Sequence, residues 1–416
     1  MRPLISRQSF SALALVVTLA LPSAVNLKTF AQSRRQPPVS NQKKNKRPAE
    51  GTQQPSQSGG QQQPPEELPP DIVGKPQEAE TITVSTAVVN VDAVVYEKKS
   101  KQIITNLKKE NFAIFEDGVK KETTNFSTPE APITVAMVLE YSRLTDRLSG
   151  DYWEAGRYEV LRPMAMFLTQ FVKPPDDYVS VIAFDIRPTP LTDFTNDPAR
   201  LSQVMSLLLR SNPAFTETNL FDALKFTLVG GRGDAVVLDR SEKRTAEYDG
   251  MASLQGRRRA VILVCSGLDT FSKINYDQAR KVAQNAGVPI YIIGTGNLFL
   301  KKYEDRLPAM DGNLGSVTPG RMSFLQAQNA LRTFAKDTGG MYFPVTFQGE
   351  LPSVLQTINA VLRSQYSLGY NPGNVRDGKQ HKIVVKVDVN GDGVYDDKEY
   401  VVQSRQYYNA PKASDK

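Results

Sequence analysis

The strongest hydrophobic signal in the chain is a continuous apolar run from Ile133 to Leu139 that turns polar at Glu140. An apolar run of this length predicts a strand buried on both faces, which is typical of a parallel sheet covered by helices. Open α/β sheets bind their ligands beyond the carboxyl ends of the strands. We therefore expect a binding surface where this run becomes polar.

The same alternation of buried strands and amphipathic helices continues through residues 131–347. The strands are expected at residues 178–184, 260–264 and 288–293. Helical spacing predicts helices near residues 161–172, 198–209, 220–228 and 324–336, and one that ends at Gly287. This order predicts the fold class α/β, with a doubly wound, mostly parallel sheet.

The segments on either side of this region have β patterns. In residues 81–130, apolar and polar positions alternate from Val89 to Val95, and in residues 348–409 strands are expected at 366–370, 382–389 and 399–405. A few short strands cannot close a core without a partner sheet. We therefore predict that residues 348–409 pack with residues 81–130 in one flanking β domain.

The amino terminus predicts export. Residues 1–31 are typical of a signal peptide, with Arg2 and Arg7 before an apolar stretch that is shorter than the roughly 20 residues of a membrane span. An uncleaved anchor is the alternative. Residues 32–80 are rich in Gln, Pro and Ser and predict a disordered linker. The expected location is secreted, periplasmic or in the cell envelope.

Composition narrows the chemistry that is available. The net charge of +7 is concentrated near the amino terminus without interleaved aromatic residues, which does not favour nucleic-acid binding. The single cysteine, Cys265, excludes an internal disulfide and lies in an apolar run, which predicts a buried thiol. The single histidine, His381, is expected at the surface. Because His381 lies outside residues 131–347, the α/β region has no histidine to act as the base of a hydrolase.

Five motifs carry a resemblance to a known family: VAMVLEYS, YVSVIAFD, TNLFDAL, VILVCSGLDT and VPIYIIGTG, in this order over roughly residues 132–347. The chain resembles the von Willebrand factor type A (VWA) domain, in the secreted form found in acidobacterial proteins. The flank that contains NLKKENFAIFEDG is similar to the flanks of that group. The resemblance implies a Rossmann-like fold, binding of proteins, and a metal-ion-dependent adhesion site (MIDAS) at the carboxyl edge of the sheet.

The family's metal site has the pattern Asp-x-Ser-x-Ser, a later Thr and a later Asp. The corresponding positions here are Glu140, Ser142, Leu144, Thr218 and Ser266. One carboxylate and a few hydroxyls leave little charge to strip water from Mg²⁺. The pattern therefore favours a degenerate MIDAS, a polar rim held by hydrogen bonds, over a functional magnesium site.

A second metal motif lies between two expected strands. Oxygen ligands occupy the calcium-loop positions, with Gly393 at the sharp turn; they are Asp388, Asn390, Asp392, Val394 (through its carbonyl), Asp396 and Glu399. A hairpin turn that binds no ion is the alternative, because Asn-Gly and Asp-Gly are ordinary turn residues. If Ca²⁺ binds, the expected effect is a more rigid hairpin.

The sequence favours a secreted, non-enzymatic, adhesion-type module that binds protein partners and has no transmembrane span after signal cleavage. Its expected binding edge consists of Glu140, Ser142, Arg143, Thr218, Ser266 and Asp269, the last of which is either a further ligand or a helix cap. The alternatives are a structural component of the cell envelope and a secreted α/β hydrolase. The tripeptide Arg232-Gly233-Asp234 resembles an integrin-recognition motif, but we attribute it to chance.

Overall fold

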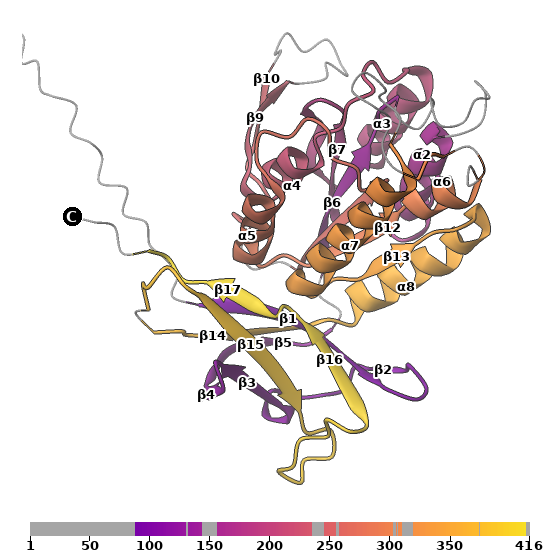
Figure 1. The fold of residues 1–416 in the computed structure, drawn as a ribbon. Helices are drawn as coiled ribbons and strands as arrows, with labels where there is room; N and C mark the ends of the chain where they lie inside the picture. The colour runs from indigo at the N-terminus through magenta and orange to yellow at the C-terminus, as the bar shows by residue number, and fades with distance from the viewer. Residues whose placement is uncertain are drawn as a thin grey trace, which may run out of the picture. The chain divides into compact units, whose positions relative to one another are not determined.

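The computed structural model describes residues 88–129, 132–143, 156–234, 245–254, 258–302, 305, 307–309, 319–373 and 375–412. The predicted signal peptide, the predicted linker and Leu144 lie outside the described residues. The helices and strands of the described residues are shown in Figure 1.

The first sheet contains six strands in the order β13-β12-β11-β6-β7-β8. Their bounds are Ile133–Glu140 for β6, Tyr178–Phe184 for β7, Pro188–Thr195 for β8, Arg258–Cys265 for β11, Ile290–Gly294 for β12 and Tyr342–Pro344 for β13. The pairings are parallel from β13 to β7, and β8 is antiparallel at the edge. Every residue of β6 and β11 is buried, because both strands lie in the centre of this sheet.

Helices cover both faces of this sheet. Val135 and Met137 of β6 pack in one core with α2, α3 and α8, whose bounds are Gly156–Gln170, Pro198–Arg210 and Leu351–Arg363. Ala136 and Val138 point to the other core, with α4, α5 and α7, whose bounds are Leu220–Val229, Tyr276–Ala286 and Arg321–Thr338. The short helix α6, Gly296–Lys302, follows β12.

The chain flanks form antiparallel sheets. A five-stranded sheet has the order β16-β1-β14-β5, with β2 paired to β1, and a four-stranded sheet has the order β17-β15-β3-β4. The bounds are Val89–Glu97 (β1), Ile103–Ile104 (β2), Phe112–Glu116 (β3), Val119–Lys121 (β4), Thr123–Ser127 (β5), Tyr366–Tyr370 (β14), Gln380–Val387 (β15), Tyr400–Ser404 (β16) and Tyr407–Asn409 (β17). Both sheets contribute to one core that contains Ile114, Tyr366 and Val385.

The predicted fold class, a doubly wound and mostly parallel α/β sheet, is wrong for the molecule. Nine of the thirteen strand pairings among the described strands are antiparallel. The parallel strands dominate the sequence pattern because they are continuous apolar runs. Most antiparallel strands are short or half-buried, and several pair across long distances in the chain, as Val89 does with Tyr370.

Two further elements differ from the sequence analysis. The segment after residue 347 was expected to contain strands, but it begins with α8, whose Leu355, Ile358 and Leu362 pack in the same core as β6. Strands β9 and β10, Gly231–Asp234 and Thr245–Tyr248, pair in an antiparallel hairpin that was not predicted. Among the described residues, no helix is long and apolar enough to span a bilayer.

Candidate functional site

The carboxyl edge of the six-stranded sheet brings Glu140, Ser142 and Ser266 together. Glu140 ends β6 and Ser266 follows β11, and these two strands are parallel neighbours. The Glu140 carboxylate accepts hydrogen bonds from the Ser266 N–H at 2.6 Å and from the Ser266 hydroxyl at 2.9 and 3.0 Å. The Ser142 hydroxyl donates to the same carboxylate at 3.4 Å. All three side chains are buried.

The Glu140 carboxyl group is unusual because it is buried and no cationic side chain of the described residues pairs with it. Burial raises its pKa to about 7, although the hydrogen bonds from Ser266 and Ser142 lower it. A carboxyl group in such a setting gives up its proton only near neutral pH, because the charged form loses its water on burial.

Thr218 connects the loop before α4 to the loop after β11 through hydrogen bonds. Its hydroxyl donates to the Leu268 carbonyl at 2.8 Å, and its backbone N–H donates to the Thr270 hydroxyl at 2.8 Å. The side chain is fully buried. The hydroxyl that the resemblance assigns to a metal is therefore used as a donor within the protein.

Asp269 lies at the amino terminus of α4. Its carboxylate accepts hydrogen bonds from the Phe221 N–H at 3.2 Å and from the Ser272 hydroxyl at 2.5 Å. Burial raises the pKa of Asp269, although these bonds lower it. Of the two roles considered for this residue, the contacts are those of a helix cap. Ser272 and Thr270, which complete this loop, were not identified from the sequence because their spacing matches no motif.

The remaining predicted edge residue, Arg143, is exposed. Its backbone N–H donates to the Phe215 carbonyl at 2.6 Å. The next position, Leu144, lies outside the described residues.

The described residues at this edge offer few charged oxygen ligands to a magnesium ion. Mg²⁺ requires near-ideal octahedral geometry and gives up its water reluctantly. Among the described residues, Glu140 is the one carboxylate that bonds to Ser142 and Ser266. The Thr218 hydroxyl donates to a carbonyl, although its oxygen keeps lone pairs that could ligate an ion. Among the described residues, no group of three acidic, histidine or cysteine side chains is arranged to hold a metal.

The predicted calcium loop joins β15 to β16 and is held by its own hydrogen bonds. Both carboxylate oxygens of Asp388 accept backbone N–H bonds, from Gly391 at 2.7 Å and from Gly393 at 2.8 Å. Asp392 accepts a bond from the Val394 N–H at 2.8 Å, and Asp396 accepts one from the Val389 N–H at 2.7 Å. The types of oxygen donor suit Ca²⁺, but in this conformation the carboxylates of Asp388, Asp392 and Asp396 accept bonds from the loop's own N–H groups.

The sequence analysis did not identify a series of exposed apolar side chains at the same edge as Glu140. Six of the nine large exposed hydrophobic residues of the described chain lie on segments at the carboxyl ends of the strands; these are Leu209, Phe215, Phe271, Met322, Leu325 and Phe347. Met322 and Leu325 lie in the first two turns of α7, which runs from this edge back to the start of β13. The signal in the sequence is weak, because an isolated apolar residue in a loop or on a helix does not reveal its exposure.

His381 was predicted to be exposed, but it is half-buried in the structure. Its ring nitrogens bond to Asp117 at 2.7 Å and Asp377 at 3.2 Å, and its ring stacks on Tyr408. Burial lowers its pKa, but the two carboxylates outweigh burial and hold the pKa above its ordinary value. Cys265 is buried, as predicted.

The tripeptide of residues 232–234 lies in strand β9, where Arg232 pairs with Glu247 on β10 at 3.2 Å. Its backbone is therefore part of a two-stranded hairpin.

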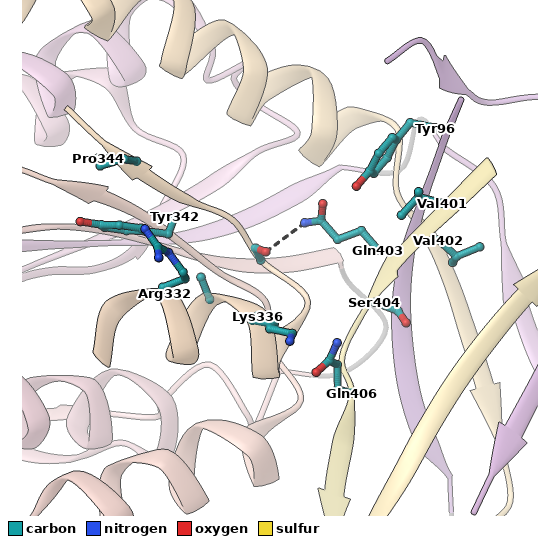
Figure 2. Close-up of a pocket in the computed structure, with 12 residues that line it drawn as sticks. Tyr96, Arg332, Lys336, Tyr342, Pro344, Val401, Val402, Gln403, Ser404 and Gln406 are labelled. Carbon is teal, nitrogen blue, oxygen red and sulfur yellow. Dashed lines mark hydrogen bonds between the residues drawn. The ribbon is translucent and has the colours of Figure 1, made fainter. Parts of the chain in front are cut away.

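A cavity of about 530 Å³ lies between α7, β13 and β16, away from the predicted edge. Figure 2 shows Arg332 beside Tyr342 on one side and Gln403 on the other. The Gln403 amide donates to the carbonyls of Gly339 and Gly340, both at 3.0 Å. None of the predicted site residues lines this cavity.

No family model and no curated protein matches the chain. Similar solved structures include BatB from Bacteroides thetaiotaomicron (15% identity, 56% of this chain and 100% of that chain, TM-score 0.35) and the PilB minor pilin from Streptococcus sanguinis (12%, 56% and 62%, 0.38). Another is proximal thread matrix protein 1 from the mussel byssus, described with a zinc-occupied MIDAS motif (12%, 58% and 48%, 0.36). At these identities and TM-scores the similarity gives no information about function, and membership of the VWA family stays a prediction.

Proposed function

We propose that this protein is a secreted or cell-envelope module of the adhesion type, which binds a protein partner without catalysing a reaction. The partner binds at the carboxyl edge of the six-stranded sheet, through exposed apolar side chains rather than through a metal ion. The observation that carries this proposal is that six of the nine large exposed hydrophobic residues of the described chain lie on segments at this edge.

Three exposed phenylalanine side chains support the proposal most directly. The side chains of Phe215, Phe271 and Phe347 are 40%, 55% and 56% exposed. Large exposed apolar groups that share one region of a surface mark interaction sites, because burying them against a partner releases water. Partial burial of one phenylalanine is worth about 1 kcal/mol.

The loops that carry these aromatic rings are tied to the buried edge. The Phe271 N–H donates to the Thr218 carbonyl at 2.9 Å, and the Phe215 carbonyl accepts the Arg143 N–H. A preorganised loop loses less entropy on binding than a free one. The exposed Arg143 adds a charge, and arginine and aromatic residues are enriched in interface hot spots.

The engagement of the polar groups supports a non-enzymatic role. The hydroxyls of Ser142 and Ser266 both bond to the Glu140 carboxylate. His381, which would have to act as the base, lies in β15 and bonds to Asp117 and Asp377. The hydrolase considered from the sequence needs a histidine within hydrogen-bond reach of its serine, and His381 does not meet this requirement because it bonds to Asp117 and Asp377.

The test is a comparative pull-down from the source organism's culture medium and cell envelope. The full chain and the double variant Phe215→Ala, Phe271→Ala are immobilised at equal density, with and without EDTA. The double variant is expected to retain at most about one tenth of the partner that the wild type retains, because it lacks two aromatic rings that binding would bury. EDTA is expected to have no effect on either protein.

The matched control is Val229→Ala, which removes an exposed apolar side chain at the opposite end of α4. Equal retention by the double variant and the wild type would reject the edge as the binding surface. Loss of the partner in EDTA would show that a metal ion bridges the contact.

A further inference from the structure

A second cavity, of about 670 Å³, lies where the five-stranded sheet meets the amino end of β11 and the carboxyl end of α5. Its volume is in the range of about 300–1,000 Å³ that is typical of small-molecule sites. None of the residues predicted to bind a partner or a metal lines it.

The wall of this cavity contains three buried guanidinium groups. Arg258, Arg259 and Arg405 are 3%, 9% and 6% exposed. The acidic residue in the lining is Asp92, whose carboxylate accepts a hydrogen bond from Ser367 at 2.5 Å. All three arginines act on the Asp92 carboxyl group electrostatically, yet burial still holds its pKa above the ordinary value. Buried charges are costly unless they are paired.

Helix ends offset part of the excess positive charge. Arg258 donates to the Leu362 carbonyl at the end of α8, and Arg405 donates to the Gln284 carbonyl at the end of α5. The carboxyl end of a helix carries roughly half a negative charge. Among the described groups of the lining, with Asp92 ionised, the two helix ends and Asp92 together leave about one positive charge without compensation.

Arg259 is not placed at a helix end. Within the described ranges, its guanidinium donates from Nη1 to the Met251 and Ala252 carbonyls, both at 3.1 Å. The Nε–H of Arg258 is buried and has no hydrogen-bond partner within the described part of the chain. The cavity wall thus contains a buried donor and a net positive charge.

The rest of the lining is partly apolar. Its apolar lining residues include Val88, Leu254 and Ala286. We propose that this cavity binds a small carboxylic acid with an apolar body, whose carboxylate pairs with Arg259 and Arg258. A guanidinium fork matches a carboxylate in geometry as well as in charge.

The experiment is isothermal titration calorimetry of the full chain with benzoate, with benzamide as the neutral molecule of the same shape, and with inorganic phosphate. Benzoate is expected to bind saturably, and benzamide and phosphate are not. In Arg259→Gln the affinity for benzoate should fall roughly tenfold or more, because a charge-assisted hydrogen bond is lost. Arg232→Gln, which changes an exposed arginine of the β9–β10 hairpin, should bind as the wild type does.

Asp92→Asn keeps the oxygen that Ser367 bonds and removes the competing negative charge, so benzoate should bind this variant more tightly than the wild type. Circular dichroism verifies that each variant is folded. If Arg259→Gln does not fold, Asp92→Asn decides the question. Flat benzoate traces, equal binding of benzamide, binding of phosphate alone, undiminished affinity in folded Arg259→Gln, or no gain in Asp92→Asn would each overturn the proposal.

Discussion

Glu140 is the residue where burial and charge conflict most directly. Its carboxyl group is held between Ser142 and Ser266 with its side chain almost fully inaccessible. Hydrogen bonds from neutral groups stabilise a carboxylate less than a cation does. The protonated form is therefore favoured up to a pKa of about 7.

This pKa predicts how stability depends on pH. The folded pKa of about 7 lies above the ordinary value of 4.5, so the folded state binds the proton more tightly than the unfolded state. The stabilisation is complete below pH 4.5 and is lost as the pH rises through 7. As the pH rises through this range, the effect of Glu140 should lower the free energy of unfolding by about 3 kcal/mol.

The measurement is urea unfolding between pH 4.5 and pH 8 for the wild type, Glu140→Gln and the control Glu247→Gln. The glutamine at position 140 keeps an acceptor for the Ser266 N–H and cannot ionise, so its unfolding free energy should fall less with pH. Parallel pH profiles of Glu140→Gln and the wild type would contradict the assignment.

At the scale of elements, the loop between β15 and β16 has the sequence pattern of a calcium loop but a hydrogen-bonding arrangement that does not present all of its oxygens to an ion. The sequence places oxygen donors at each calcium position, and the structure bonds those of Asp388 and Asp392 to N–H groups of the loop. Binding would require some of these oxygens to turn toward a shared ion. The cost of that change lowers the apparent affinity.

We expect weak, saturable binding of Ca²⁺ by the full chain, with a Kd of about 10⁻⁴ to 10⁻³ M, as in extracellular modules. Calorimetric titration should show no binding to Asp392→Ala. The control Asp397→Asn changes an acid of the same loop that pairs with Lys386 and occupies no ligand position. A flat trace for the wild type would leave the loop as an ordinary hairpin turn.

At the scale of the whole molecule, Arg405 joins the β part to the helices. It follows β16, and its guanidinium donates to the carbonyls of Gln284 in α5, Asn90 in β1 and Tyr407. Burial lowers its pKa to about 10, so it remains charged at neutral pH. An added Cβ at Gly287 would lie 2.3 Å from Nη1 of Arg405, so this contact also requires a glycine.

Replacing this arginine should destabilise the molecule. Arg405→Met leaves three carbonyls without their donor, and we expect a loss of about 3 kcal/mol of unfolding free energy. Gly287→Ala should lose about 1 kcal/mol or more, because it adds a clash and a strained φ of +62°. Urea unfolding measures both, and Arg232→Met is the control for an exposed ion pair. If the free energy of unfolding of Arg405→Met differs from that of the wild type by less than about 1 kcal/mol, the Arg405 hydrogen bonds do not contribute substantially to stability.

The sequence predicts elements better than it predicts architecture. Strand β7 covers the predicted residues, Tyr178–Phe184, and α3 begins at Pro198 behind Asp197, as predicted. The class of the fold was wrong, because the apolar runs of the central strands outweighed the weaker alternation of the antiparallel ones. Helix α8 was missed between the strand patterns, and only its packing against the six-stranded sheet shows where it belongs.

The sequence alone determined which segments are buried strands and which polar residues follow them, because burial on both faces requires continuous apolar runs. That placed Glu140 and Ser266 at the ends of β6 and β11. The tertiary structure alone decided that the Thr218 hydroxyl points to a carbonyl, that Phe215 and Phe271 are exposed, and that arginines from distant segments share a cavity. Hydrogen-bond partners, exposure and charge balance depend on neighbours brought together by folding, and no local pattern records them.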